Sequence, residues 1–220
     1  MEELLLPLFP LEAVLLPEEP LPLHIFEDRY KAMIGDCLEA KAEGSGQQEF
    51  GVVLIKNQEM QSVGCSARII NLTRKYPDGR MDIFTVGARR FEILMTHQDD
   101  ASTPYLRAGV EHFDDEPGSD TPPDPDAEHA IELFRKVMQK LHQAPNMPIH
   151  LPRPYRYLSF RIAAALPLDL NFKQEQLTVR NEPERLQQVS DAIEVLIPQI
   201  ETAQKTRSKA GGNGHARIQN

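Results

Sequence analysis

The sequence lacks tryptophan and contains only two cysteines, Cys37 and Cys65, among its 220 residues. Two cysteines are too few for a disulfide scaffold or for a zinc site built from four of them. We interpret both as reduced, buried thiols, because free cysteine is among the most buried residue types and neither has a neighbouring histidine in a basic setting. The sequence therefore predicts no metal site and no cysteine nucleophile.

Positive charge and long apolar runs are also scarce. The 24 Lys and Arg residues are outnumbered by 33 Asp and Glu, which gives a formal net charge of −9. Nucleic-acid binding requires cations clustered on one face, so we expect no nucleic-acid partner. No apolar run approaches the roughly 18 residues of a membrane span, and the start MEELLLPLFP has acids where a signal peptide has basic residues. We expect no membrane partner and a cytoplasmic location.

Motifs of the common enzyme classes are missing as well. The sequence has no H-E-x-x-H, no G-x-S-x-G, no dinucleotide-binding glycine fingerprint and no Walker A motif. Gly44-Ser45-Gly46 is not continued as a phosphate-binding loop. We therefore expect no catalytic residues and no cofactor.

Proline is abundant near the start of the chain, where five prolines interrupt the apolar stretch Leu4–Tyr30. Each proline lacks an N–H and disfavours the helical conformation of the residue before it. The apolar pieces between the prolines are therefore expected to be short and extended. We predict strands at Leu4–Phe9 and Ala13–Leu16, at an edge, a start or a bulge of a sheet.

The next part of the chain reads as one helix followed by strands. Apolar residues at helical spacing predict an amphipathic helix over Asp28–Ala42, with Asp28 as its cap. Tyr76-Pro77-Asp78-Gly79 is typical of a hairpin turn. Apolar groups on both faces of the strand after it suggest a sheet covered by helices, with Phe84 and Tyr105 in the core. The predicted strands are Phe50–Ile55, Gly64–Tyr76, Arg80–Gly87, Arg90–His97 and Tyr105–Phe113.

An acidic, proline-rich segment, DDEPGSDTPPDPD, then separates these strands from four predicted helices. We expect it to bury nothing and to act as a linker or loop. The predicted helices cover about Asp124–Gln143, Tyr155–Leu166 and Asn171–Val179, and a last one starting at Asn181 with a capping-box variant. The predicted domains are 1–113 (β-rich), 114–125 (linker), 126–205 (helical) and 206–220 (disordered tail).

Several of these segments resemble the family of the Lon protease N-terminal, substrate-binding domain. The opening PLFPL..VLLP..PLPLHIFEDRY is similar to the family's start, with Glu18 where the family usually has Gly and Cys65 where Thr is common. The resemblance continues, in family order, through Phe50–Ile55, Val63–Ile69, Asp78–Arg80, Gly87–Ile93, Leu158–Leu168 and Glu184–Leu186.

The resemblance implies an α+β fold: a small β-barrel-like (pseudo-barrel) N-terminal domain with one packed helix, followed by an all-helical C-terminal bundle. It also implies a non-catalytic, bacterial-type module that recognises unfolded or partly folded polypeptide, or another protein as an adaptor. Lon carries its ATPase and its serine–lysine protease after this domain, and this chain ends before either fits. The alternative function is a small-molecule-binding protein or an uncharacterised hydrolase. The oligomeric state is not indicated.

The candidate contact surface lies where charged and aromatic residues follow the proline-rich stretch: Phe26, Glu27, Arg29, Tyr30 and Lys31. Two other polar groups have both a functional and a structural interpretation. His24 with Glu27 or Asp28 is either a ligand set or an acid–base pair, or else a satisfied histidine beside a capped helix start with an Arg–carboxylate bridge. Arg89 and Arg90 either hold a peptide carboxylate or mark a strand end in solvent.

Overall fold

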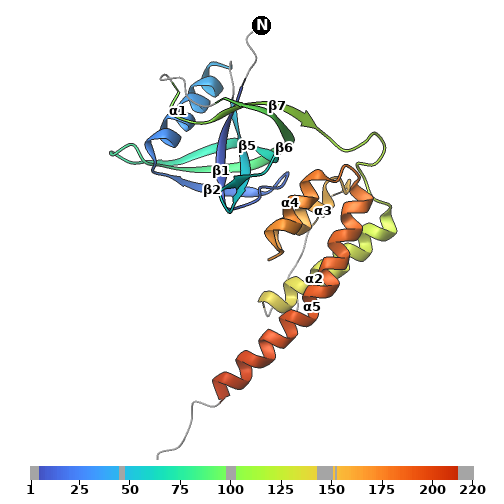
Figure 1. The fold of residues 1–220 in the computed structure, drawn as a ribbon. Helices are drawn as coiled ribbons and strands as arrows, with labels where there is room; N and C mark the ends of the chain where they lie inside the picture. Colours follow the sequence, from blue (N-terminus) through green and yellow to red (C-terminus); the bar gives the residue numbers. More distant parts are fainter. Residues whose placement is uncertain (1–4, 45–47, 98–102, 143–150, 152, 213–220) are drawn as a thin grey trace, which may run out of the picture.

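The computed structural model describes residues 5–44, 48–97, 103–142, 151 and 153–212, with side chains up to residue 206 (Figure 1). The predicted loops around residues 45–47 and 98–102 and the end of the predicted tail lie outside these ranges. The elements within them, in chain order, are β1 (Leu6–Leu11), β2 (Pro20–Ile25), α1 (Asp28–Glu43), β3 (Glu49–Lys56), β4 (Glu59–Met60), β5 (Val63–Lys75), β6 (Met81–His97), β7 (Arg107–Phe113), α2 (Asp124–His142), α3 (Leu158–Ala164), α4 (Leu170–Thr178) and α5 (Glu182–Gly212).

The strands form a ring. Hydrogen-bonded neighbours follow the order β1-β7-β6-β5-β3, and β1 pairs again with β3, which returns the path to its start. The β1–β3 pairing is parallel and the others along this path are antiparallel. The chain is thus an α+β protein with a ring-shaped sheet and, among the described residues, five helices.

Phe91 fills the inside of the ring. Its side chain is fully buried in a small cluster with Leu6, Leu8, Val53 and Ala108, which come from the strands around it. Two glycines on neighbouring strands provide the space. A Cβ atom at Gly51 would lie 2.6 Å from the Phe91 ring, and one at Gly64 would lie 2.7 Å from it. The side chain of Phe91 therefore points into the ring.

A second, larger core lies outside the ring. Helix α1 packs Met33, Ile34 and Cys37 onto one side of the sheet (Figure 1), and the C-terminal helices contribute residues such as Phe160 and Val189 to the same cluster. Helices α2 and α5 lie side by side and extend away from the ring (Figure 1). No helix in the described ranges has the length and apolar character needed to cross a membrane.

The observed elements differ from the predicted ones at several points. Ala13–Leu16 does not form a strand, although Val14, Leu15 and Leu16 are buried, whereas Pro20–Ile25 forms β2. The two strands predicted within Arg80–His97 are one continuous strand, β6. Helix α3 starts at Leu158 rather than Tyr155, and α5 continues to Gly212, into the segment predicted to be disordered.

Capping also differs from the prediction at one helix and agrees with it at another. Asp28 is the first residue of α1, and the N-cap position is held by Glu27, whose side chain makes no capping bond. At the start of α5 the Oδ1 of Asn181 accepts a hydrogen bond of 3.0 Å from the backbone N–H of Glu184, as predicted. Glu18, where the family usually has Gly, adopts a left-handed conformation with φ of 64°.

Candidate functional site

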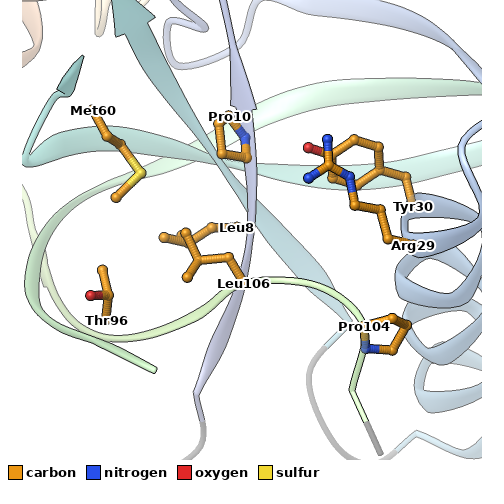
Figure 2. A pocket seen from close by; sticks show the side chains of 8 residues that line it. All are labelled: Leu8, Pro10, Arg29, Tyr30, Met60, Thr96, Pro104 and Leu106. Carbon is orange, nitrogen blue, oxygen red and sulfur yellow. The ribbon is translucent and has the colours of Figure 1, made fainter. Parts of the chain in front are cut away.

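A pocket of about 320 Å³ opens beside the N-terminus of α1 (Figure 2). Strand β1 crosses its centre. Met60 of β4 and Thr96 of β6 lie on the side of β1 away from α1, whereas Pro104, shortly before β7, lies beside α1 (Figure 2). Five of its eight lining residues are apolar or proline, so its surface favours apolar ligand groups. The lining residues are Leu8, Pro10, Arg29, Tyr30, Met60, Thr96, Pro104 and Leu106.

Among the described residues, Arg29 is the only charged one that lines this pocket. Its guanidinium carbon lies 4.5 Å from the centre of the Tyr30 ring, which is a cation–π distance. Its Nε and Nη2 both approach the same oxygen of Glu27, at 3.0 and 2.8 Å. The side chain remains about half exposed, and within the described residues its Nη1 makes no hydrogen bond, so it can still donate to a ligand.

Tyr30 forms the base of this corner. Its side chain is 8% exposed and packs edge-on against Phe9, with 4.2 Å between ring centres. Burial raises the pKa of its hydroxyl, which Arg29 only partly offsets, so the group stays neutral at physiological pH. Among the described residues nothing hydrogen-bonds this hydroxyl, and it is available to a ligand as donor or acceptor.

The structure brings only two of the five predicted contact residues into the pocket. Arg29 and Tyr30 line it, and Glu27 reaches it only through its ion pair with Arg29. Phe26 is 60% exposed and lies against His24 instead. Lys31 forms a 3.0 Å ion pair with Asp28. The aromatic and charged clustering in the sequence located Arg29 and Tyr30, but Leu8, Met60 and Leu106 gave no local signal.

His24 does not form the proposed pair with Glu27 or Asp28. Its Nδ1 lies 2.5 Å from Oδ1 of Asp82, a residue 58 positions away, and the Tyr76 hydroxyl donates to the other oxygen of Asp82 at 2.8 Å. Hydrogen bonds from His24 and Tyr76 hold the pKa of Asp82 below its usual range. No group of three or more His, Cys, Asp or Glu in the described part of the chain is arranged to hold a metal ion.

Arg90 lies in a buried ion-pair network, so of its two interpretations the one that places it at a strand end in solvent is wrong. Its Nη2 lies 2.6 Å from Asp115, and both side chains are 2% exposed. Asp115 also binds Arg185 at 2.6 and 2.7 Å, and Arg185 in turn pairs with buried Glu182 at 2.5 Å. The expectation that the acidic segment buries nothing is therefore wrong at Asp115.

This network joins the ring to the helices. Arg90 belongs to β6 and donates to the backbone oxygens of Leu177 and Val179, while Glu182 accepts from the backbone and hydroxyl of Ser159. Burial alone would raise the pKa of Asp115, but hydrogen bonds and charge from Arg185 and Arg90 outweigh it and lower the pKa. Burial raises the pKa of Glu182 despite Arg185. Since these groups are out of contact with solvent, we assign them to structure.

The other candidate groups offer less for catalysis. Burial raises the pKa of the Cys37 thiol to about 12 and also raises that of Cys65, so neither is a thiolate at neutral pH. A second pocket of about 420 Å³ lies between the ring and the C-terminal helices. Its carboxylates, Glu92 and Glu111, face each other across β6 and β7, and both are exposed to water.

Comparison with known proteins gives a consistent result. The family model of the ATP-dependent protease La (LON) substrate-binding domain matches residues 5–195. A Lon protease of Flavobacterium johnsoniae is 24% identical over 222 aligned positions, which cover 93% of this chain. The chain spans only 26% of the length of that relative.

Two solved structures share the fold. The crystal structure of a Lon N-terminal domain protein from Xanthomonas campestris superposes with a TM-score of 0.62 at 26% identity, covering 84% of this chain and 96% of that one. The N-terminal domain of a Mycobacterium avium complex Lon protease also gives 0.62, at 17% identity, covering 86% and 98%. The second likeness concerns the fold alone.

Proposed function

The chain belongs to the LON substrate-binding domain family, and we propose that it binds exposed, partly unfolded polypeptide, or another protein as an adaptor, without catalysing a reaction. The observation that supports this proposal is the pocket beside α1, whose described residues combine a largely apolar lining with the cation of Arg29 and the hydroxyl groups of Tyr30 and Thr96. An apolar side chain of a peptide fits such a lining, and its backbone oxygens can accept from Arg29 or Tyr30.

The alternative, a small-molecule site or a hydrolase, requires several ionisable groups converging in a water-poor pocket. In the part of the pocket beside α1 that the structure describes, Arg29 is the one charged residue, and the carboxylates of the second pocket are exposed. Polypeptide binding is therefore the better-supported function. We extend the proposal to a cytoplasmic location and to partners that are neither nucleic acid nor membrane.

Fluorescence anisotropy with a labelled, permanently unfolded protein tests the site. We expect saturable binding by the wild type, about fivefold weaker binding by Arg29→Ala and a similar or larger loss for Met60→Asp, which places a charge in the apolar lining. Lys31→Ala is the matched control, since it removes a helix cation next to Arg29 that lies outside the pocket.

Absence of saturable binding by the wild type would remove the peptide-binding function. Equal affinity in Arg29→Ala, Met60→Asp and Lys31→Ala would leave the function standing but move the site. Cleavage of the labelled protein by the pure chain, with or without ATP, would contradict the non-catalytic part of the proposal.

We also propose that residues 1–113 and 126–205 are separate domains of this module, joined by residues 114–125. The interior of the ring is supplied by residues 6–110 alone, which supports independent folding of the first part. A fragment that ends at Glu116 is expected to unfold cooperatively in urea, at a lower midpoint than the whole chain because Arg185 and the Val179 oxygen are lost. A fragment without a cooperative transition would show that the helices complete one common core.

A further inference from the structure

The outer surface of the sheet beyond the ring carries a row of exposed rings. There β2 pairs with the first half of β6, so that Pro22 lies opposite Phe84 and His24 opposite Asp82. The alternate residues Ile83 and Thr85 point into the core and are buried, whereas Phe84 points away from it and is 36% exposed. We call this surface the outer face: Pro22, His24, Phe26, Ile70, Tyr76 and Phe84.

The rings of the outer face contact one another. Phe26 stacks on His24 with 6.1 Å between centres, and Tyr76 meets His24 edge-on at 5.8 Å. Phe26 is 60% exposed and Ile70, on the neighbouring strand β5, is 50% exposed. Several large apolar groups exposed on one face are typical of an interaction surface rather than of scattered surface residues.

The hairpin that borders the outer face is locally basic in a chain of net charge −9. Arg74 and Arg80 both lie over the Tyr76 ring, at 4.5 and 5.0 Å from its centre. Arg80 is paired with Asp78. Arg74 and the adjacent Lys75 form no ion pair with any described residue. The one carboxylate in the middle of the face, Asp82, is already bonded to His24 and Tyr76.

The edge of this sheet does not accept another strand. A proline within a strand must direct its missing N–H away from the partner strand. Pro20 and Pro22 both pair with β6, so the positions that lack an N–H face the free edge of β2. A ligand must therefore lie across the outer face and cannot extend the sheet by backbone pairing.

We propose that the outer face is a second interaction surface, separate from the pocket beside α1, and that it binds an acidic segment of a partner protein that carries aromatic, proline or other apolar residues. The apolar residues of the partner contact Phe26, Ile70 and Phe84. Its carboxylates accept from Arg74 and Lys75. Charge complementarity of this kind adds specificity and speeds association.

Two other occupants fit less well. The chain's own acidic segment, offered by a second copy, is already held within the molecule: Asp115 is buried, and Glu116 bonds the backbone of Arg180 at 2.8 Å. A single-stranded nucleic acid would stack on the same rings but brings one phosphate per nucleotide. The hairpin has only Arg74 and Lys75 to meet them, so an acidic peptide, whose charges are spaced by apolar residues, matches the face better.

The test uses the full chain and two short labelled peptides that differ only in charge, one built from Asp, Glu, Phe and Pro and the other with Lys at every acidic position. We expect saturable binding of the acidic peptide, weaker at high salt, and binding of the Lys peptide about tenfold weaker or absent. Arg74→Glu and Phe84→Ser should each weaken the acidic peptide about tenfold. Phe26→Ser, in a segment outside the strands, should also weaken it and serves if Phe84→Ser fails to fold.

Val195→Ser is the matched control, because Val195 is 63% exposed on α5, away from the outer face, and should leave binding unchanged. Equal affinity for both peptides, no saturable binding of the acidic peptide, or unchanged binding by Arg74→Glu and Phe26→Ser would each overturn the proposal. Tighter binding of a labelled single-stranded oligonucleotide than of the acidic peptide would replace it with a nucleic-acid surface.

Discussion

Replacing Phe91 by alanine tests whether the ring depends on the side chain at its centre. Phe91 is fully buried and is the only aromatic member of the small cluster inside the ring. Core Phe→Ala substitutions typically cost about 3–5 kcal/mol of unfolding free energy. We expect the upper part of that range, because the glycines that face Phe91, Gly51 and Gly64, have no side chains with which to fill the cavity.

A second substitution separates this mechanism from a general loss of apolar area. In the wild type, Gly51→Ala should destabilise the protein, since its new Cβ would lie 2.6 Å from the Phe91 ring. In the Phe91→Ala background that contact no longer exists, and only Leu6 and Leu8, each at 2.9 Å, must adjust. The double variant should therefore be more stable than the sum of the single effects predicts, by about 1–3 kcal/mol.

Urea unfolding followed by circular dichroism measures all four proteins of this cycle. Phe26→Ala is the control, because the 60% exposed Phe26 should change stability by less than about 0.5 kcal/mol. A loss below about 1 kcal/mol in Phe91→Ala would refute the placement of Phe91 inside the ring. Additive effects of Phe91→Ala and Gly51→Ala would refute the direct contact between the two positions.

Three further predictions follow from buried or strained residues. Asp115→Asn should cost about 3–5 kcal/mol because it leaves Arg90 buried without a carboxylate and leaves Arg185 with Glu182 alone. Burial raises the pKa of Asp115, but hydrogen bonds and charge from these arginines outweigh it and lower the pKa. The stabilisation by Asp115 is therefore complete above the usual value of 3.8 and is lost as the pH falls below it, and acid titration of the urea midpoint should show a larger loss in the wild type than in the variant. At Glu18, whose φ is 64°, glycine should give a thermal midpoint corresponding to about 1 kcal/mol more stability than alanine, and equal midpoints would contradict backbone strain there. Cys37, with its pKa raised to about 12 by burial and Asp36, should react slowly with a thiol reagent at pH 8 and quickly in denaturant, whereas fast native labelling would contradict its burial.

Local sequence patterns were sufficient to predict the elements whose determining residues lie close together in the sequence. The apolar spacing of Tyr30, Met33, Ile34 and Cys37 predicted α1, and all four are buried. The turn chemistry of Tyr76–Gly79 predicted the β5–β6 hairpin, in which the N–H of Gly79 bonds the oxygen of Tyr76 at 3.0 Å. In both cases the determining interactions lie within a few residues of each other, where sequence spacing reports them.

The same reasoning failed where pairing partners are distant. Ala13–Leu16 is apolar, as a buried strand would be, but burial does not require a ladder, and the segment is buried as irregular chain. The strand lies instead at Pro20–Ile25, where Leu21, Leu23 and Ile25 alternate with outward residues. The sequence shows this alternation, but the prolines between these residues are unfavourable in a strand that has partners on both sides. They are tolerated in β2 because it pairs with β6 on one side only, and the sequence does not report that pairing.

The buried ion pairs could not be predicted from local sequence patterns, because their partners lie far apart in the sequence. Arg90 donates hydrogen bonds to Asp115, 25 residues away in the sequence, and to the backbone oxygen of Val179, 89 residues away. Asp115 accepts from Arg185, which lies 70 residues further along the chain. A charged residue is normally exposed, and it can be buried only where the fold delivers its partners. Composition predicted that the acidic segment is a linker, but it could not identify Asp115 as the aspartate that two arginines bind.

The proposed outer face shows that the periodicity of apolar residues does not report whether the rest of the chain covers a surface. The strand after the hairpin carries apolar groups on both faces, which predicted a sheet covered by helices and placed Phe84 with Tyr105 in the core. Tyr105 is buried, but Phe84 is exposed, and the pattern there marks an uncovered apolar face instead. Periodicity reports that a side chain is apolar on a given face; whether the chain itself covers that face depends on where distant helices pack. If the chain binds polypeptide as we propose, the apolar positions that the fold leaves uncovered are therefore the ones to test first for binding.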